Sequence, residues 1–259
     1  MAARVRFLAF CVIVLGLPGG LMALGDPQLG DLGKLALILS PAVAGLALNL
    51  GLGKRAGSIR WREVGGAALV TLTIVGLALA VSLLTGASTF SGTAYTPDRA
   101  AAAISATLLT SVLEELGWAG GGLALALKAY GRRVGVLILG LVWAAWHLIP
   151  AFLKIGLFPE LEAAPPLMLV VFVIACVIYR ELLTRFVERS GSWLGAAAGH
   201  AAPNIALVTL MTCGLVVLDK PQAWPLFPAP GGVVFAALAL AAVWVMRSKI
   251  SASRPLPVG

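Results

Sequence analysis

The sequence predicts an all-α, polytopic membrane protein with about eight transmembrane helices and both termini cytoplasmic. Its residues are 60% hydrophobic and 12% charged, whereas soluble domains carry about 25% charged residues. Apolar segments close to the ~20 residues that a spanning helix needs recur along the chain. Basic residues gather in alternate loops. We therefore expect residues 1–259 to form a single membrane domain.

Eight apolar segments are the candidate spans, and the loops between them are short. The segments cover residues 7–24, 35–52, 64–86, 100–127, 134–154, 166–180, 192–212 and 231–246. Residues 179–190 mix charged and apolar side chains at helical spacing. This stretch is expected either to extend the sixth helix or to lie on the inner membrane surface.

The distribution of Lys and Arg sets the predicted orientation. Fifteen of the nineteen lie near the termini or in alternate loops, at positions 4, 6, 54, 55, 60, 62, 128, 132, 133, 180, 185, 189, 247, 249 and 254. Because positively charged loops stay in the cytoplasm, both termini should be inside. The net charge of +8 then reflects topology and contact with the lipid bilayer. We find no recognition motif, so we expect no nucleic-acid partner.

The first segment has a second interpretation. Arg4 and Arg6 precede an apolar run, which is also typical of a secretory signal peptide, and Ala23 and Gly25 give a weak cleavage site. Removing this segment would leave seven spans and break the charge alternation. We therefore expect a retained helix.

The chain has two histidines, and both lie inside apolar segments, as does a pair of adjacent glutamates. Counted from the nearest basic residue at the inner helix end, Glu114 and His147 lie 14 residues deep and His200 lies 11 residues deep. At about 1.5 Å per residue these depths are roughly 16–21 Å, near the middle of a hydrocarbon core of about 30 Å. Ionisable groups at that depth are costly and usually functional. Three helices that agree on depth predict one buried polar site.

Helical spacing predicts which side chains share a face. His200 and Asn204 are four residues apart and face the same way. Pro203 lies between them and removes the backbone donor to the Gly199 carbonyl, so the helix should bend there. Trp143 lies one turn before His147 and should pack over it or line the pocket.

Glu114 and Glu115 point about 100° apart on a helix, so only one of them can face the site directly. The other carboxylate needs its own partner or a proton, because an unpaired charge is unstable in a low dielectric.

These residue types suit hydrolysis. A carboxylate beside a histidine can activate water, and a second histidine with an asparagine amide can stabilise an oxyanion. Zinc is an alternative, because Glu114, His147 and His200 form a known catalytic ligand set. Either histidine alone would more often be a hydrogen-bonding residue between helices, and the glutamate pair alone could be a proton relay. The combination favours a hydrolytic site.

Three short motifs carry a family resemblance. Residues 114–119 match the pattern E-E-x-x-x-R except at the last position, residues 143–147 match F-x-x-x-H with Trp143 for Phe, and residues 200–204 match H-x-x-x-N. In this order the chain resembles the CPBP family, the CAAX-protease and bacteriocin-processing intramembrane proteases, also called Abi proteins. The resemblance covers residues 100–212, the expected catalytic core, and it also implies eight membrane helices.

The resemblance implies a role for each site residue. Glu114 would be the general base and His147 would help to activate water, while His200 and Asn204 would form the oxyanion site. Glu115, Trp118 and Trp143 would be supporting residues. The family is best described by a metal-free, glutamate-type mechanism, so we expect no cofactor, with zinc as the possible exception.

The important departure from the family pattern is Ala119, which replaces the motif Arg. That Arg would lie one turn beyond Glu115 and could pair with it. Without it, we predict that Glu115 is protonated or paired with a donor from another helix. Trp143 in place of Phe keeps an aromatic wall.

The sequence therefore predicts a multi-pass intramembrane endopeptidase of the cell membrane, acting on a membrane-associated or leader peptide. The abundance of Ala and Gly is typical of a GC-rich bacterial source, which favours such peptides over prenylated ones. Two alternatives stay open. A weakened or inactive member could act as a bacteriocin-immunity or scaffold protein, which Ala119 would favour. A proton-coupled transporter would use the same buried acids.

Overall fold

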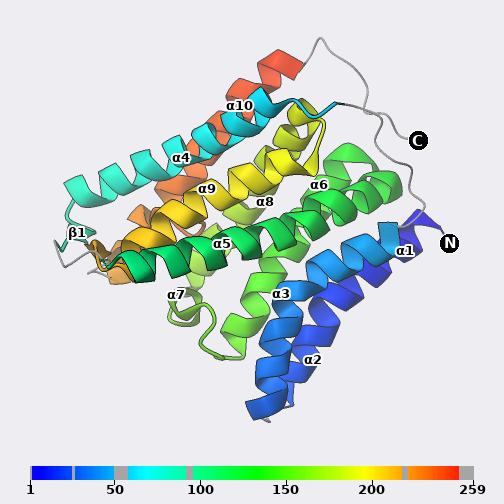
Figure 1. The fold of residues 1–259 in the computed structure, drawn as a ribbon, viewed down its shortest axis with the longest axis horizontal. Coiled ribbons are helices and arrows are strands. Elements are labelled where there is room, and N and C mark those ends of the chain that lie inside the picture. Colours follow the sequence, from blue (N-terminus) through cyan, green and yellow to red (C-terminus); the bar gives the residue numbers. More distant parts are fainter. Residues whose placement is uncertain (1, 25–26, 50–57, 92–95, 218–220, 251–259) are drawn as a thin grey trace.

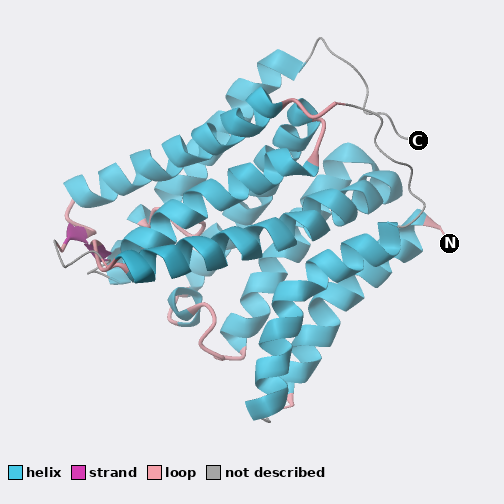
Figure 2. Cartoon of the chain, viewed as in Figure 1, coloured by secondary structure: helices cyan, strands magenta, loops and turns pink. Residues whose placement is uncertain are grey.

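The computed structural model describes residues 2–24, 27–49, 58–91, 96–217 and 221–250, and it is helical almost throughout (Figures 1 and 2). The one sheet among these residues pairs β1 (Thr89–Phe90) with β2 (Val216–Val217) in antiparallel register. The predicted all-α fold is confirmed. Lys54, Arg55 and Arg254, which contributed to the predicted charge pattern, lie outside the described residues.

The helices follow the predicted segments closely. Their bounds are α1 (Ala3–Cys11), η1 (Val12–Gly16), α2 (Leu17–Ala23), α3 (Pro27–Asn49), α4 (Trp61–Leu84), α5 (Pro97–Gly117), η2 (Trp118–Gly122), α6 (Leu123–Phe152), α7 (Pro159–Glu162), α8 (Pro166–Ser190), α9 (Trp193–Thr212), η3 (Pro221–Leu226) and α10 (Val233–Ile250). The elements η1 and η2 are π-helical and η3 is a 3₁₀ helix. The chain turns within α6 at Gly131, where φ is 74°, and this turn separates the fourth predicted segment from the fifth (Figure 1).

The structure decides between the two interpretations of residues 179–190. Helix α8 continues past the predicted span to Ser190, so this stretch extends the sixth helix. Arg180 and Arg185 are therefore not loop residues: their side chains are buried inside the bundle. They were assigned to a loop because the sequence alone does not distinguish arginines in a loop from arginines in a buried continuation of the helix.

The protein is a multi-pass membrane protein. Among the described residues, six stretches are long and apolar enough to cross a membrane, and one of them, Pro97–Phe152, contains the turn at Gly131. Residues Val233–Arg247 form a further, shorter apolar helix. Eight crossings and cytoplasmic termini stay predictions.

The basic ends of several helices meet at one end of the bundle. The Arg60 guanidinium donates to the Glu188 carbonyl at 3.0 Å, and Arg189 pairs with Glu63 at 2.8 Å. These contacts join the start of α4 to the end of α8. At the opposite end of α4, the turn that follows it pairs through β1 with the segment after α9. The alternation of basic loops in the sequence thus corresponds to one basic end of the molecule.

Close packing of small residues fixes the end of α5. Gly117 lies so near the backbone of Pro41 that a Cβ would overlap it, and Gly121 lies equally near Gly45 of α3. Small residues at this spacing let membrane helices approach closely. The contact holds the turn that follows Glu114 and Glu115 firmly against α3.

Backbone carbonyls released by prolines are capped by neighbouring helices. Pro203 cannot donate to the Gly199 carbonyl, as predicted, and the Tyr179 hydroxyl of α8 donates to that oxygen at 2.7 Å. Pro41 releases the Leu37 carbonyl in the same way, and Trp146 Nε1 donates to it at 3.1 Å. Each bond ties a helix that contains a proline to its neighbour.

Candidate active site

Helices α5, α6 and α9 bring the candidate residues together. His200 Nδ1 lies 3.0 Å from Glu115 Oε1, and Trp143 Nε1 donates to Glu114 Oε2 at 3.4 Å. The Trp143 ring lies 5.4 Å, centroid to centroid, from both the His147 ring and the His200 ring. Glu114, His147 and His200 therefore lie around Trp143, whereas their common depth in a membrane stays a prediction.

Glu115 has the partner that the sequence lacked at position 119. Arg180 of α8 reaches it with two parallel bonds, from Nη1 to Oε2 at 2.8 Å and from Nη2 to Oε1 at 3.0 Å. The two side chains are 1% and 0% exposed. The prediction that another helix supplies a donor is confirmed, and the charge lost at Ala119 is restored from a different part of the chain.

Aromatic rings hold the Arg180 guanidinium in place. Its Cζ lies 4.3 Å from the centre of the Trp143 ring and 6.0 Å from that of Trp118. Cations over tryptophan faces are stabilised by the ring quadrupole, and more strongly when desolvated. Trp118 packs in turn on Phe10 and Trp146, at 5.4 and 6.3 Å. Trp118 thus links the site to α1, and its supporting role stays a prediction.

His147 is oriented by its own helix. Its Nδ1 lies 2.9 Å from the Trp143 carbonyl, one turn back. A carbonyl can only accept, so Nδ1 carries the proton and Nε2 is left as the acceptor of a neutral ring. Phe158 and Phe172 pack on the ring at 5.1 and 5.6 Å. The side chain remains half-buried.

The site divides into two groups by accessibility. Glu114, His147 and Asn204 are half-buried, whereas Glu115 and His200 are buried. Asn204 lies one turn beyond His200, and its amide has no hydrogen-bond partner in the described part of the chain. The accessible group contains the side chains expected to touch water or a substrate. The buried group forms a charge-paired support beneath it.

Sequence reasoning missed three contributors: Arg180, Tyr179 and Phe158. A signal for Arg180 was present, because it lies nine residues before Arg189. At about 1.5 Å per residue that is roughly 14 Å into the helix, close to the depth of His200. Phe158 lies in the short connection before α7, where no periodic pattern indicates which side chain turns inward.

The residues do not fit a zinc site as they lie here. Among the described residues, no group of three or more His, Cys, Asp or Glu side chains is placed to hold a metal ion. Nδ1 of each histidine is bonded, to the Trp143 carbonyl or to Glu115, so only Nε2 of each ring could bind a metal. No catalytic step is therefore assigned to a metal, and a metal-free mechanism stays a prediction.

Comparison with known proteins agrees with the site. Residues 96–206 match the family model described as type II CAAX prenyl endopeptidase Rce1-like. The matched range includes every residue of the candidate site. Comparison with curated proteins gives no match. The family match confirms the predicted resemblance: residues 96–206 are similar to the Rce1-like CAAX endopeptidases, which is consistent with a CPBP family intramembrane protease.

Proposed function

We propose that the protein hydrolyses a peptide bond of a membrane-associated substrate, with Glu114 as the general base. The observation that supports this proposal is that two adjacent carboxylates have very different hydrogen-bond partners. Arg180 and His200 engage both oxygens of Glu115. Glu114 is half-buried and accepts one long bond, from Trp143. Glu115 is therefore committed to structure, while Glu114 is left to exchange a proton.

The proposed reaction begins with a water molecule beside Glu114 and the free Nε2 of His147. The Glu114 carboxylate takes one proton from the water, and the oxygen attacks the carbonyl carbon of the scissile peptide bond. The C–N bond then breaks, and Glu114 returns the proton to the leaving nitrogen. His147 orients the water through Nε2, since its Nδ1 is occupied.

His200 and Asn204 are proposed to stabilise the oxyanion. The Asn204 amide can donate from the same face of α9. For His200 to donate from Nε2 while Nδ1 donates to Glu115, the ring must carry both protons. With both glutamates ionised, Arg180 and this imidazolium would leave the site neutral overall, as a low-dielectric environment favours.

The proposed substrate is a leader peptide or another membrane-associated peptide, cut in the cell membrane. The depth of the site requires a peptide that reaches into the bilayer from its surface. Ala119 was the feature that favoured a non-catalytic binding or immunity protein. Because Arg180 supplies the missing charge to Glu115, that feature no longer argues against catalysis.

Glu114→Gln tests the mechanism most directly. The substitution keeps the size and the bond from Trp143 but removes the base, so cleavage should fall about 10²–10⁴-fold. Protein termini would be compared in membranes that contain wild type, Glu114→Gln or Glu160→Gln. The last is a matched control, an exposed glutamate of α7. New termini should occur with wild type and the control only.

The same comparison can overturn the proposal. If the three membranes have identical termini while all three proteins are inserted at equal levels, the protein does not act as this peptidase. If Glu114→Gln cleaves as well as wild type, Glu114 is not the base.

A further inference from the structure

A basic cleft lies between α6, α8 and α10, at the end of the bundle where basic residues gather. Its volume is about 900 Å³. The charged lining consists of Arg132, Arg133, Glu181, Arg185, Glu188 and Arg247. The cleft is separate from the candidate active site, because Glu181 follows Arg180 on α8 and adjacent residues point about 100° apart.

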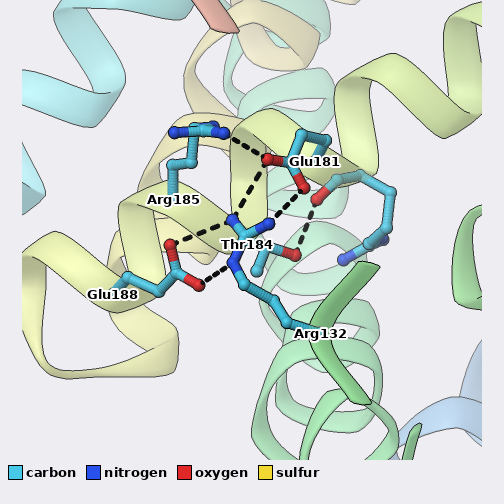
Figure 3. A network of polar contacts seen from close by, with 6 residues as sticks. Arg132, Glu181, Thr184, Arg185 and Glu188 are labelled. Carbon is cyan, nitrogen blue, oxygen red and sulfur yellow. Dashed lines mark hydrogen bonds and ion pairs between the residues drawn. The ribbon is translucent and has the colours of Figure 1, made fainter. Parts of the chain in front are cut away.

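Two of the arginines that line the cleft form no ion pair with the other described residues. Arg132 donates to Glu181 and to Glu188 with two bonds each, at 2.7–3.1 Å, and Arg185 pairs with Glu181 at 2.6 Å (Figure 3). Arg133 and Arg247 have no ion-pair partner among the residues that the structure describes. Four arginines against two glutamates give the lining a net charge of +2, concentrated on the two unpaired side chains.

An apolar groove on α10 adjoins the cleft at Arg247. Ala237, Leu240, Ala241 and Trp244 line it, and its volume is about 410 Å³. These positions recur every three or four residues and form one exposed stripe that ends at Arg247. Leu240 and Trp244 are 53% and 70% exposed. The two small alanines leave the space between the larger side chains open.

We propose that the cleft and groove together bind one anionic phospholipid of the adjoining leaflet. Arg133 and Arg247 would hold the phosphate headgroup, and an acyl chain would lie along the α10 stripe. Basic pockets between transmembrane helices on the cytoplasmic side bind anionic lipid headgroups, and tryptophan favours the interface between headgroups and chains. A free phosphate would use the arginines but not the groove, and a zwitterionic lipid would leave the net charge uncompensated.

Native mass spectrometry of the full-length protein tests this inference without any assay of cleavage. Phosphatidylglycerol and phosphatidylcholine with identical chains would be compared on wild type, on Arg133→Gln/Arg247→Gln and on Arg62→Gln. Arg62 is an exposed arginine of α4 that does not line the cleft. The double variant should lose about thirtyfold in affinity for phosphatidylglycerol, because each basic residue contributes about 1 kcal/mol to an anionic headgroup site and about 1.4 kcal/mol is tenfold. Arg62→Gln should bind like wild type.

The groove and the headgroup site can be tested separately. Ala241→Phe fills the groove and should weaken long-chain phosphatidylglycerol while leaving a short-chain analogue unaffected. Ala102→Phe places the same bulk at an exposed position of α5 and should change neither.

Three results would overturn the proposal. Equal retention of the two lipids by wild type would show that the arginines do not select an anionic headgroup. Binding of inorganic phosphate as tight as that of the lipid would identify a phosphate site without a lipid chain. Cross-links between two copies through α10 that the Ala241→Phe variant abolishes would show that the stripe is a contact between protein chains.

Discussion

Two arginine–glutamate clusters lie on adjoining residues of α8 and differ in their surroundings. Arg180 holds Glu115 in a pair whose side chains are 1% and 0% exposed. Glu181, the next residue, accepts from Arg132, and these side chains are 19% and 35% exposed. Both contacts are bidentate, with bonds of 2.8–3.1 Å. The same geometry therefore serves the interior of the bundle and its basic end.

The difference in burial determines what each pair can do. Breaking a buried pair by removing one partner leaves an uncompensated charge, which costs about 3–5 kcal/mol. The outer pair is partly exposed, so water and salt screen it, and its contribution lies nearer the ~0–1 kcal/mol of surface pairs. The buried pair also fixes Glu115 against His200, whereas the side chains of the outer pairs make no hydrogen bond to a side chain of the candidate site among the described residues. A matched geometry thus indicates neither equal stability nor equal function.

Arg180→Met should have the largest effect of the variants that separate the two clusters. It leaves Glu115 buried without its cation, so the free energy of unfolding should fall by about 3–5 kcal/mol. Cleavage should be lost as well, because Glu115 would no longer hold His200. Thermal unfolding of the purified protein measures the first effect, and the appearance of new protein termini measures the second.

Arg132→Met is the matched control for this prediction. It removes from α6 an arginine that is also bidentate to a glutamate, and that bonds a second glutamate besides, but at a partly exposed position. If both variants lowered the stability equally, burial would not be the property that distinguishes the clusters.

An arginine at position 119, where the family motif has one, would test whether the buried Glu115 needs a cation. In the Arg180→Met background, Ala119→Arg places a cation one turn beyond Glu115, and part of the stability and of the cleavage should return. Ala119→Leu in the same background adds bulk without charge and should restore neither. Equal recovery with Arg and Leu would mean that position 119 contributes packing rather than charge.

Much of the site could be predicted because several independent patterns agree. Glu114, His147 and His200 share a depth, and the four-residue spacing of His200 and Asn204 fixes a face. Pro203 also predicted a free carbonyl at Gly199, which the structure pairs with Tyr179. These inferences need only the rise and twist of a helix, which long apolar segments obey closely.

The remainder depended on tertiary contacts that no local pattern encodes. Arg180 was assigned to a loop because charge normally ends a span, yet a carboxylate from α5 compensates it. The direct bond between His200 and Glu115 was also missed, since the pairing of two side chains across helices depends on helix rotation. The turn at Gly131 could be placed only between segments, because a single residue in the left-handed region leaves no periodic pattern in the sequence.

Tyr179→Phe should have a smaller effect on stability than Arg180→Met. It removes the hydroxyl that caps the Gly199 carbonyl, and hydrogen bonds between membrane helices average about 0.6 kcal/mol, up to about 1.7. Thermal unfolding should register a loss in this range. Tyr130→Phe is the control, because the hydroxyl of Tyr130 has no hydrogen-bond partner among the described residues. A loss as large as that of Arg180→Met would show that a neutral bond contributes as much as the buried ion pair.

The smallest effect is expected from Glu188→Gln. This substitution takes one of the two carboxylates from Arg132 but leaves Glu181 in place, so the loss of stability should be under about 1 kcal/mol. Raising the salt concentration to about 1 M shortens the screening length to about 3 Å and should reduce the difference from wild type further. The loss caused by Arg180→Met should persist at the same salt concentration, because its partner is enclosed by protein. If salt reduced both losses alike, solvent ions would reach the buried pair. Burial would then not distinguish the Arg180–Glu115 pair from the cluster around Arg132.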